Sequence, residues 1–180
     1  MPTVATSTVT AVLTLAVVGL VAPTPAMAYN VEACAYSSAT VHYYDGSSYA
    51  TATRDAAEAW TATSTPINME SVGDSGTYQF SVVTANFGSG HDGLTYYTCS
   101  GGYMSNFQTS YYNSFYTSGY STTARKQLMV HEMGHELGLD HAGTSTCSGQ
   151  PIMYPNSSRY FTCNHQNPQP DDIDGINSLY

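Results

Sequence analysis

The chain has 180 residues, of which 42% are hydrophobic and 9% are charged. That length and apolar content suit one compact domain with a buried core. Thirteen acidic residues against four basic ones give a formal net charge of -9 at pH 7. Such a surface argues against nucleic acid or an anionic membrane as a partner. We therefore expect an acidic, monomeric, single-domain protein whose partner is not a polyanion.

The first 28 residues have the pattern of an export signal. An apolar stretch runs from Ala11 to Ala22 and is followed, after two prolines, by Ala26-Met27-Ala28. Small residues at positions 26 and 28 fit cleavage after Ala28. The stretch is also shorter than the roughly 20 residues that a membrane-spanning helix needs. No Lys or Arg precedes it, which departs from the usual pattern. We expect a signal peptide at 1–28, a mature domain at 29–180, and a secreted, extracellular product.

The mature chain reads as mostly strands followed by a long helix. Alternating apolar and polar residues predict strands at 39–44, 67–72, 78–85, 94–97 and 103–112, with a turn at Asp45-Gly46 after the first. The alanine-rich segment from Ser48 to Ser64 has an apolar stripe at helical spacing that includes Trp60, so we expect a helix packed on the core. Residues 113–120 are expected to be irregular. Hydroxyl side chains at 121–123 can cap a helix from about Ala124 to Leu137.

Four cysteines in an exported chain indicate two disulfides. They are Cys34, Cys99, Cys147 and Cys163, and they allow three connectivities. We favour Cys34–Cys99 and Cys147–Cys163, because the second bond would staple the loop that contains Met153. A metal role for the thiols is not indicated, since the sequence has no C-x-x-C pair.

The run HEMGHELGLDH, residues 131–141, has the spacing of a catalytic zinc site. Residues four apart lie on one face of a helix, so His131 and His135 can bind one ion. Gly138 can end the helix in the left-handed conformation, and the turn can bring His141 back to the same ion. Three neutral imidazoles leave the fourth tetrahedral position to water, as in catalytic zinc sites. Glu132 follows the first ligand, where a general base for that water would lie.

The full pattern H-E-x-x-H-x-x-G-x-x-H resembles the metzincin clan of zinc endopeptidases. The segment PIMYP around Met153 looks like the Met-turn beneath the zinc, and Tyr154 directly after the methionine matches the matrixin branch. The last ten residues are similar to the final helix of matrixin catalytic domains. In that family paired aspartates, here Asp171 and Asp172, tie the helix to the Met-turn. Three features depart from the family: Ala142 replaces the usual serine, the sequence has no cysteine-switch propeptide motif, and we expect no hinge or propeller domain after the final helix.

The resemblance implies an α+β, metzincin or zincin-like single domain. It would comprise a twisted, mostly β N-terminal part, the active-site helix, the Met-turn and a C-terminal helix. It also implies a hydrolase, a secreted zinc metalloendopeptidase that cleaves protein or peptide substrates. Zinc would be held by His131, His135 and His141, with Glu132 as general base. Residues 155–157 would line the pocket for the side chain after the scissile bond. Matrixins often carry structural calcium and a second zinc as well, for which the candidate ligands are Asp74, His91 and Asp92.

Two other interpretations stay open at this point. Snapalysin-like proteases are similarly small and secreted, but they use aspartate as third ligand, whereas this chain has His141 there and Asp140 just before it. A non-catalytic, zinc-stabilised extracellular binding domain would use exposed tyrosines for a ligand such as carbohydrate. The candidate side chains are Tyr111, Tyr112, Tyr116 and Tyr120. Such a domain would need neither an open metal position nor Glu132.

Overall fold

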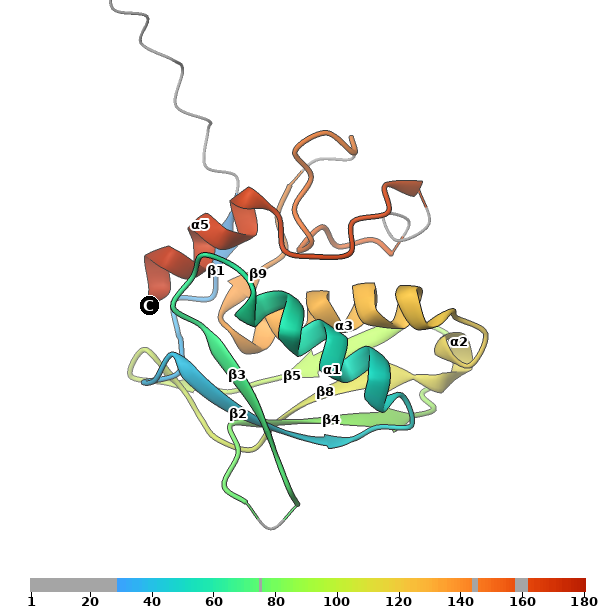
Figure 1. Cartoon of the computed structure of the whole chain (residues 1–180), viewed down its shortest axis with the longest axis horizontal. Coiled ribbons are helices and arrows are strands. Elements are labelled where there is room, and N and C mark those ends of the chain that lie inside the picture. Colours follow the sequence, from blue (N-terminus) through green and yellow to red (C-terminus); the bar gives the residue numbers. More distant parts are fainter. Residues whose placement is uncertain (1–28, 75, 144–145, 158–161) are drawn as a thin grey trace, which may run out of the picture.

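A five-stranded, mostly parallel sheet forms the base of the protein (Figure 1). The computed structural model describes residues 29–180 except 75, 144–145 and 158–161, so the expected signal segment lies outside the described residues. The strand order is β3-β2-β4-β8-β5, in which the first four strands are parallel and the edge strand β5 is antiparallel to β8. The strands span β2 Thr40–Gly46, β3 Asn68–Val72, β4 Phe80–Ala85, β5 Gly93–Tyr96 and β8 Gln108–Asn113.

Two helices lie side by side on one face of this sheet (Figure 1). Helix α1, Ala50–Thr61, connects the parallel strands β2 and β3, a connection that requires a crossover. Helix α3, Thr122–Glu136, contacts α1 and strands β5 and β8. Trp60 of α1 is fully buried and donates its Nε1 proton to the carbonyl of Val130 at 2.9 Å. The buried apolar side chains of α1, α3 and the inner sheet face form one continuous core, which fixes α3 over the sheet.

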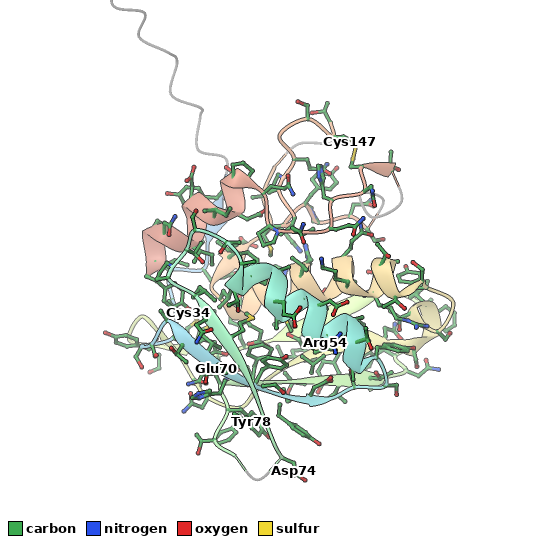
Figure 2. The ribbon with its side chains drawn as sticks, viewed as in Figure 1. Cys34, Arg54, Glu70, Asp74, Tyr78 and Cys147 are labelled. Atoms are coloured by element: carbon green, nitrogen blue, oxygen red, sulfur yellow. A yellow bond between two sulfur atoms is a disulfide. The ribbon has the colours of Figure 1, made fainter. Side chains whose placement is uncertain are left out.

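Short elements complete the fold around α3. Strand β1, Asn30–Val31, pairs with β9, Leu139–Asp140, and helix α5, Pro170–Leu179, contacts both. Strand β6, Cys99–Ser100, pairs with β7, Tyr103–Met104, and the short helix α2, Ser114–Thr117, precedes α3. Disulfides join Cys34 to Cys99 and Cys147 to Cys163, the connectivity favoured above. Figure 2 places Cys147 in the looped segment beyond the helices, far from Cys34 at the sheet end of the molecule.

The predicted elements are confirmed in type, and their boundaries shift by a few residues, with three corrections. The expected strand 103–112 is broken into β7 and β8, and Phe107 between them has a positive φ of 65°. Asp45 and Gly46 continue β2, because they pair with Val82 and Val83 of β4, instead of forming a turn. The segment expected to be irregular contains α2. Across the parts of the chain that the structure describes, no helix has the length and apolar character needed to cross a membrane.

Candidate metal centre

Helix α3 and the turn after it bring three histidines together. Ser121 caps the helix by accepting a hydrogen bond from the Ala124 N–H at 3.1 Å. His131 and His135 lie one turn apart near the other end of the helix. Gly138 follows at a φ of 99°, and a β-carbon there would collide with the carbonyl oxygen of Cys34, so both conformation and space require glycine. The chain then reverses into β9, which pairs with β1 and delivers His141 to the other two imidazoles.

The three imidazoles face a common point through their Nε2 atoms. Nε2 of His141 lies 3.2 Å from Nε2 of His131 and 3.2 Å from Nε2 of His135. Tetrahedral zinc with bonds of about 2.0–2.1 Å to nitrogen separates its ligand atoms by roughly 3.3 Å. The observed spacing therefore suits zinc without rearrangement.

The partners of the other ring nitrogens fix the tautomers. Nδ1 of His131 lies 2.8 Å from the carbonyl oxygen of Ile152, and Nδ1 of His135 lies 2.8 Å from that of Leu139. A carbonyl oxygen only accepts, so both Nδ1 atoms carry protons and both Nε2 atoms present lone pairs. A proton on Nε2 of His141 could be donated to Nε2 of His131 or to Nε2 of His135, but not to both. A shared cation satisfies all three nitrogens, so these residues fit zinc.

Electrostatics also favour neutral ligands at this point. Burial, and next the neighbouring His141, lower the pKa of His135 to about 4, so that this imidazole is neutral at physiological pH. Neutral imidazole is the form that binds a metal. His131 is buried, whereas His141 is exposed at the opening of the site.

The three histidines lie in the wall of a cavity of about 310 Å³. Residues 93–95 of the edge strand also line it. So do residues 155–157, which we expected to line the pocket for a substrate side chain. Glu132 lines the same cavity, and its side chain is 5% exposed. Its Oε2 accepts a hydrogen bond from Oγ1 of Thr95 at 2.7 Å. The carboxylate thus lines the same cavity as the three imidazoles, and Glu132 is next in sequence to His131.

The segment around Met153 packs against the turn of α3 that carries His131 and His135. Met153 is 1% exposed, and a β-carbon on Gly134, between the two helical ligands, would collide with its sulfur. The Ala142 N–H donates to the Met153 carbonyl at 3.0 Å, which fixes the residue after the third ligand. This is the position expected of a Met-turn, in which an apolar thioether forms the floor of the site.

Asp172 connects the C-terminal helix to this floor. Its Oδ2 accepts from the Ile152 N–H at 2.8 Å and from the Gln169 N–H at 2.7 Å, and its Oδ1 accepts from the Met153 N–H at 3.3 Å. Burial outweighs these three donors and raises the pKa of Asp172 to about 6. The tie expected of the aspartate pair is therefore made by Asp172, and Asp171 lies in the first turn of α5.

Glu136 is a buried acid that the sequence analysis missed. Its side chain is fully buried among Ser110 and Tyr36, whose hydroxyls lie 2.9 and 3.0 Å from its two carboxyl oxygens. Burial raises the pKa of Glu136 to about 8, so that the carboxyl is protonated at neutral pH. One signal was available in the sequence, since Glu136 follows Glu132 by four residues and so shares its helix face.

The structure does not support the expected calcium site. Within the described residues, the three histidines are the only cluster of three or more His, Cys, Asp or Glu side chains close enough to share one ion. His91 and Asp92 line the cavity of the histidines, and Asp92 accepts a hydrogen bond from the Tyr120 hydroxyl at 3.1 Å. Asp74 lies at the tip of the β3–β4 connection, on the far side of the sheet from the looped segment (Figure 2).

Comparison with known proteins bears on this geometry. Residues 33–180 match the model of the Matrixin family, peptidase family M10. Two solved structures of myroilysin are similar to the chain. The first has 21% identity, 63% coverage of this chain, 54% coverage of the myroilysin chain and a TM-score of 0.44. The second has 18% identity, coverages of 75% and 66%, and a TM-score of 0.41.

The chain thus spans between about half and two thirds of the length of those structures. A comparison with curated proteins gives no significant match. The family match covers most of the chain and includes the three histidines, Glu132, Met153 and the C-terminal helix. The chain therefore belongs to the matrixin family of zinc metallopeptidases.

Proposed function

We propose that residues 29–180 form a secreted, zinc-dependent endopeptidase domain that hydrolyses peptide bonds in protein substrates. One observation carries the proposal: the Nε2 lone pairs of His131 and His135, fixed by their Nδ1 partners, converge with His141 in a cavity that the buried Glu132 also lines. Zinc bound there would supply a Lewis acid that polarises the scissile carbonyl and lowers the pKa of an attacking water.

The protein groups have distinct tasks in this proposal. His131, His135 and His141 hold the ion, and the carbonyls of Ile152 and Leu139 orient the first two rings. Glu132, whose Oε2 accepts a hydrogen bond from Thr95, accepts the proton of the attacking water. It then passes this proton to the leaving amine.

Secretion is supported by the apolar N-terminal stretch with its Ala-Met-Ala site and by the two disulfides, which are typical of oxidising compartments. The family match begins at residue 33, close to the expected start of the mature domain.

The test is cleavage of unfolded casein by the zinc-loaded protein, with and without a chelator. We expect chelator-sensitive cleavage that Glu132→Gln abolishes while zinc stays bound. Glu70→Gln is the matched control, because Glu70 is exposed on β3 at the outer end of the sheet (Figure 2). Full activity of Glu132→Gln would remove Glu132 as the base. Absence of cleavage by the folded, zinc-loaded wild type would favour the non-catalytic binding domain.

A further inference from the structure

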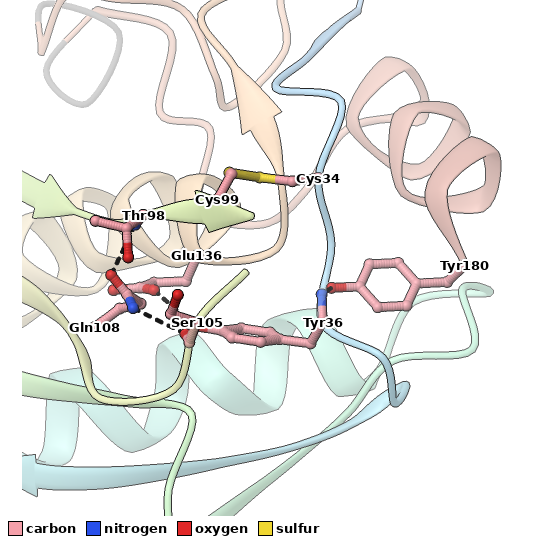
Figure 3. The surroundings of a disulfide bond; sticks show 8 residues. All are labelled: Cys34, Tyr36, Thr98, Cys99, Ser105, Gln108, Glu136 and Tyr180. Atoms are coloured by element: carbon pink, nitrogen blue, oxygen red, sulfur yellow. Dashed lines mark hydrogen bonds between the residues drawn. A yellow bond between two sulfur atoms is a disulfide. The ribbon is translucent and has the colours of Figure 1, made fainter. Parts of the chain in front are cut away.

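A chain of hydrogen bonds connects the buried Glu136 to the carboxylate of Glu132. Oε1 of Glu136 lies 2.9 Å from Oγ of Ser110, which lies 3.0 Å from Oγ1 of Thr95, which lies 2.7 Å from Oε2 of Glu132. Tyr36 contacts the other end, with its hydroxyl 3.0 Å from Oε2 of Glu136. Figure 3 shows Tyr36 reaching toward Glu136 from the segment that follows the Cys34–Cys99 disulfide.

Two pairs of residues from different elements create this chain. Glu132 and Glu136 are four residues apart on α3, and Thr95 and Ser110 are register partners in the antiparallel pair β5–β8. Strands β5 and β8 therefore present two hydroxyls, at matched spacing, to the two carboxyl groups on α3. Each of the two carboxyl groups contacts one of these hydroxyls, and the two hydroxyls contact each other.

We propose that Glu136 and Ser110 are positioning residues that act through Thr95 to hold the carboxylate of Glu132 in its place in the cavity that the three histidines line. This inference deepens the proposed peptidase function and rests on it. Neither Ser110 nor Glu136 is among the described residues that line the cavity, so neither would touch substrate.

The physical reason is control of a rotatable hydroxyl. Thr95 also lies 3.1 Å from the carbonyl oxygen of Glu132, so its proton has competing acceptors. The Ser110 hydroxyl contacts Thr95 Oγ1 and so limits the directions in which the Thr95 proton can point. The contact with Glu136 in turn restricts rotation of the Ser110 hydroxyl. The chain thus directs a donor at Glu132 and restricts the rotamers of that side chain. A base held in one place avoids the rate loss that follows from small misplacements.

The decisive variants separate hydrogen bonding from charge and volume. Ser110→Ala interrupts the series of hydrogen bonds, and Glu136→Leu removes its buried end. Glu136→Gln preserves every contact, because the amide oxygen can accept from Tyr36 while the amide nitrogen donates to Ser110. Ser81→Ala is the matched control, since Ser81 is a buried serine on the neighbouring strand β4 and takes no part in this series of hydrogen bonds.

Steady-state kinetics on a cleaved peptide should show a loss of about tenfold in kcat for Ser110→Ala and Glu136→Leu, with KM and bound zinc unchanged. Glu136→Gln should recover most of the kcat lost in Glu136→Leu, and Ser81→Ala should match wild type. A Glu136→Gln variant as slow as Glu136→Leu would overturn the inference, and so would an unimpaired Ser110→Ala. If Glu136→Leu does not fold, Ser110→Ala decides alone.

A crystal structure of zinc-free Ser110→Ala gives a readout that does not depend on activity. We expect the Glu132 side chain to occupy more than one rotamer there and a single rotamer in zinc-free wild type. A single, unchanged rotamer in the variant would overturn the inference. If wild type cleaves no peptide, the proposed function fails, and this comparison still tests the positioning of Glu132.

Discussion

Gly93 of the edge strand lies directly against the carboxylate of Glu132. A β-carbon at this position would collide with Oε1 of Glu132 and lie 2.8 Å from Cδ1 of Leu128. The backbone of Gly93 is not in the left-handed region, so alanine is excluded by space alone. Gly93→Ala must therefore displace the carboxylate or the strand.

We expect Gly93→Ala to lower kcat at least about tenfold while bound zinc is retained, because the base moves and the ligands do not. Peptidase kinetics and metal analysis test this. Gly73→Ala is the control, since a β-carbon there meets nothing within 4 Å. Equal activity of the two variants would show that the Glu132 position tolerates displacement.

The contact between Gly134 and Met153 gives a second prediction, on stability. Glycine to alanine inside an exposed helix normally stabilises by up to about 1 kcal/mol. At Gly134 the new methyl would meet the Met153 sulfur and lie 3.3 Å from Cζ2 of Trp60. Overpacking of this kind costs about 1–3 kcal/mol, so we expect Gly134→Ala to lower the free energy of unfolding in urea.

A compensating change tests the cause. Met153→Ala makes room for the methyl, so the double variant should be more stable than the sum of the two single effects predicts. Gly119→Ala, whose β-carbon would lie 3.7 Å from its nearest neighbour, should be near wild type. Additive single effects would mean that the Gly134 methyl is accommodated elsewhere.

Metal removal gives a third prediction. We expect zinc to bind the folded protein and not the unfolded chain, and therefore to raise the unfolding temperature, by an amount equivalent to about 2.7 kcal/mol at a concentration of 100 times Kd. His141→Ala should abolish this rise and leave the metal-free protein folded, because His141 is exposed. His165→Ala replaces a half-buried histidine outside the cluster and should respond to zinc like wild type. Thermal melts with and without zinc measure the difference. A zinc response in His141→Ala would place the third ligand elsewhere.

Local spacing made the metal site predictable, because helix geometry alone places His131 and His135 on one face and Gly138 permits the reversal toward His141. The same rules located α1, α3 and most strands. They could not show that Ser110 and Thr95 face Glu136 and Glu132, since that depends on β5 pairing with β8 and on α3 packing across both. The burial of Glu136 could not be read from the sequence, because charge usually indicates exposure and the hydroxyls that contact Glu136 are distant in sequence.

Asp172 provides a prediction on pH. Its pKa is about 6 in the folded protein, against an ordinary value of 3.8. Below about pH 3.8 both folded and unfolded forms are protonated, and between 3.8 and 6 only the folded form holds the proton. The stability that Asp172 contributes is therefore present at low pH and is lost as pH rises through about 6, by as much as about 3 kcal/mol.

The measurement is the free energy of unfolding of metal-free wild type minus that of Asp172→Asn, as a function of pH. We expect this difference to fall between about pH 4 and pH 6 and to stay level above, because asparagine does not titrate. Asp174→Asn, an exposed position on the same helix, should show no such fall. A difference that rises over this range would mean that the backbone donors from residues 152, 153 and 169 outweigh burial. Asp172 would then act as a stabilising anion that fixes the floor of the metal site at neutral pH.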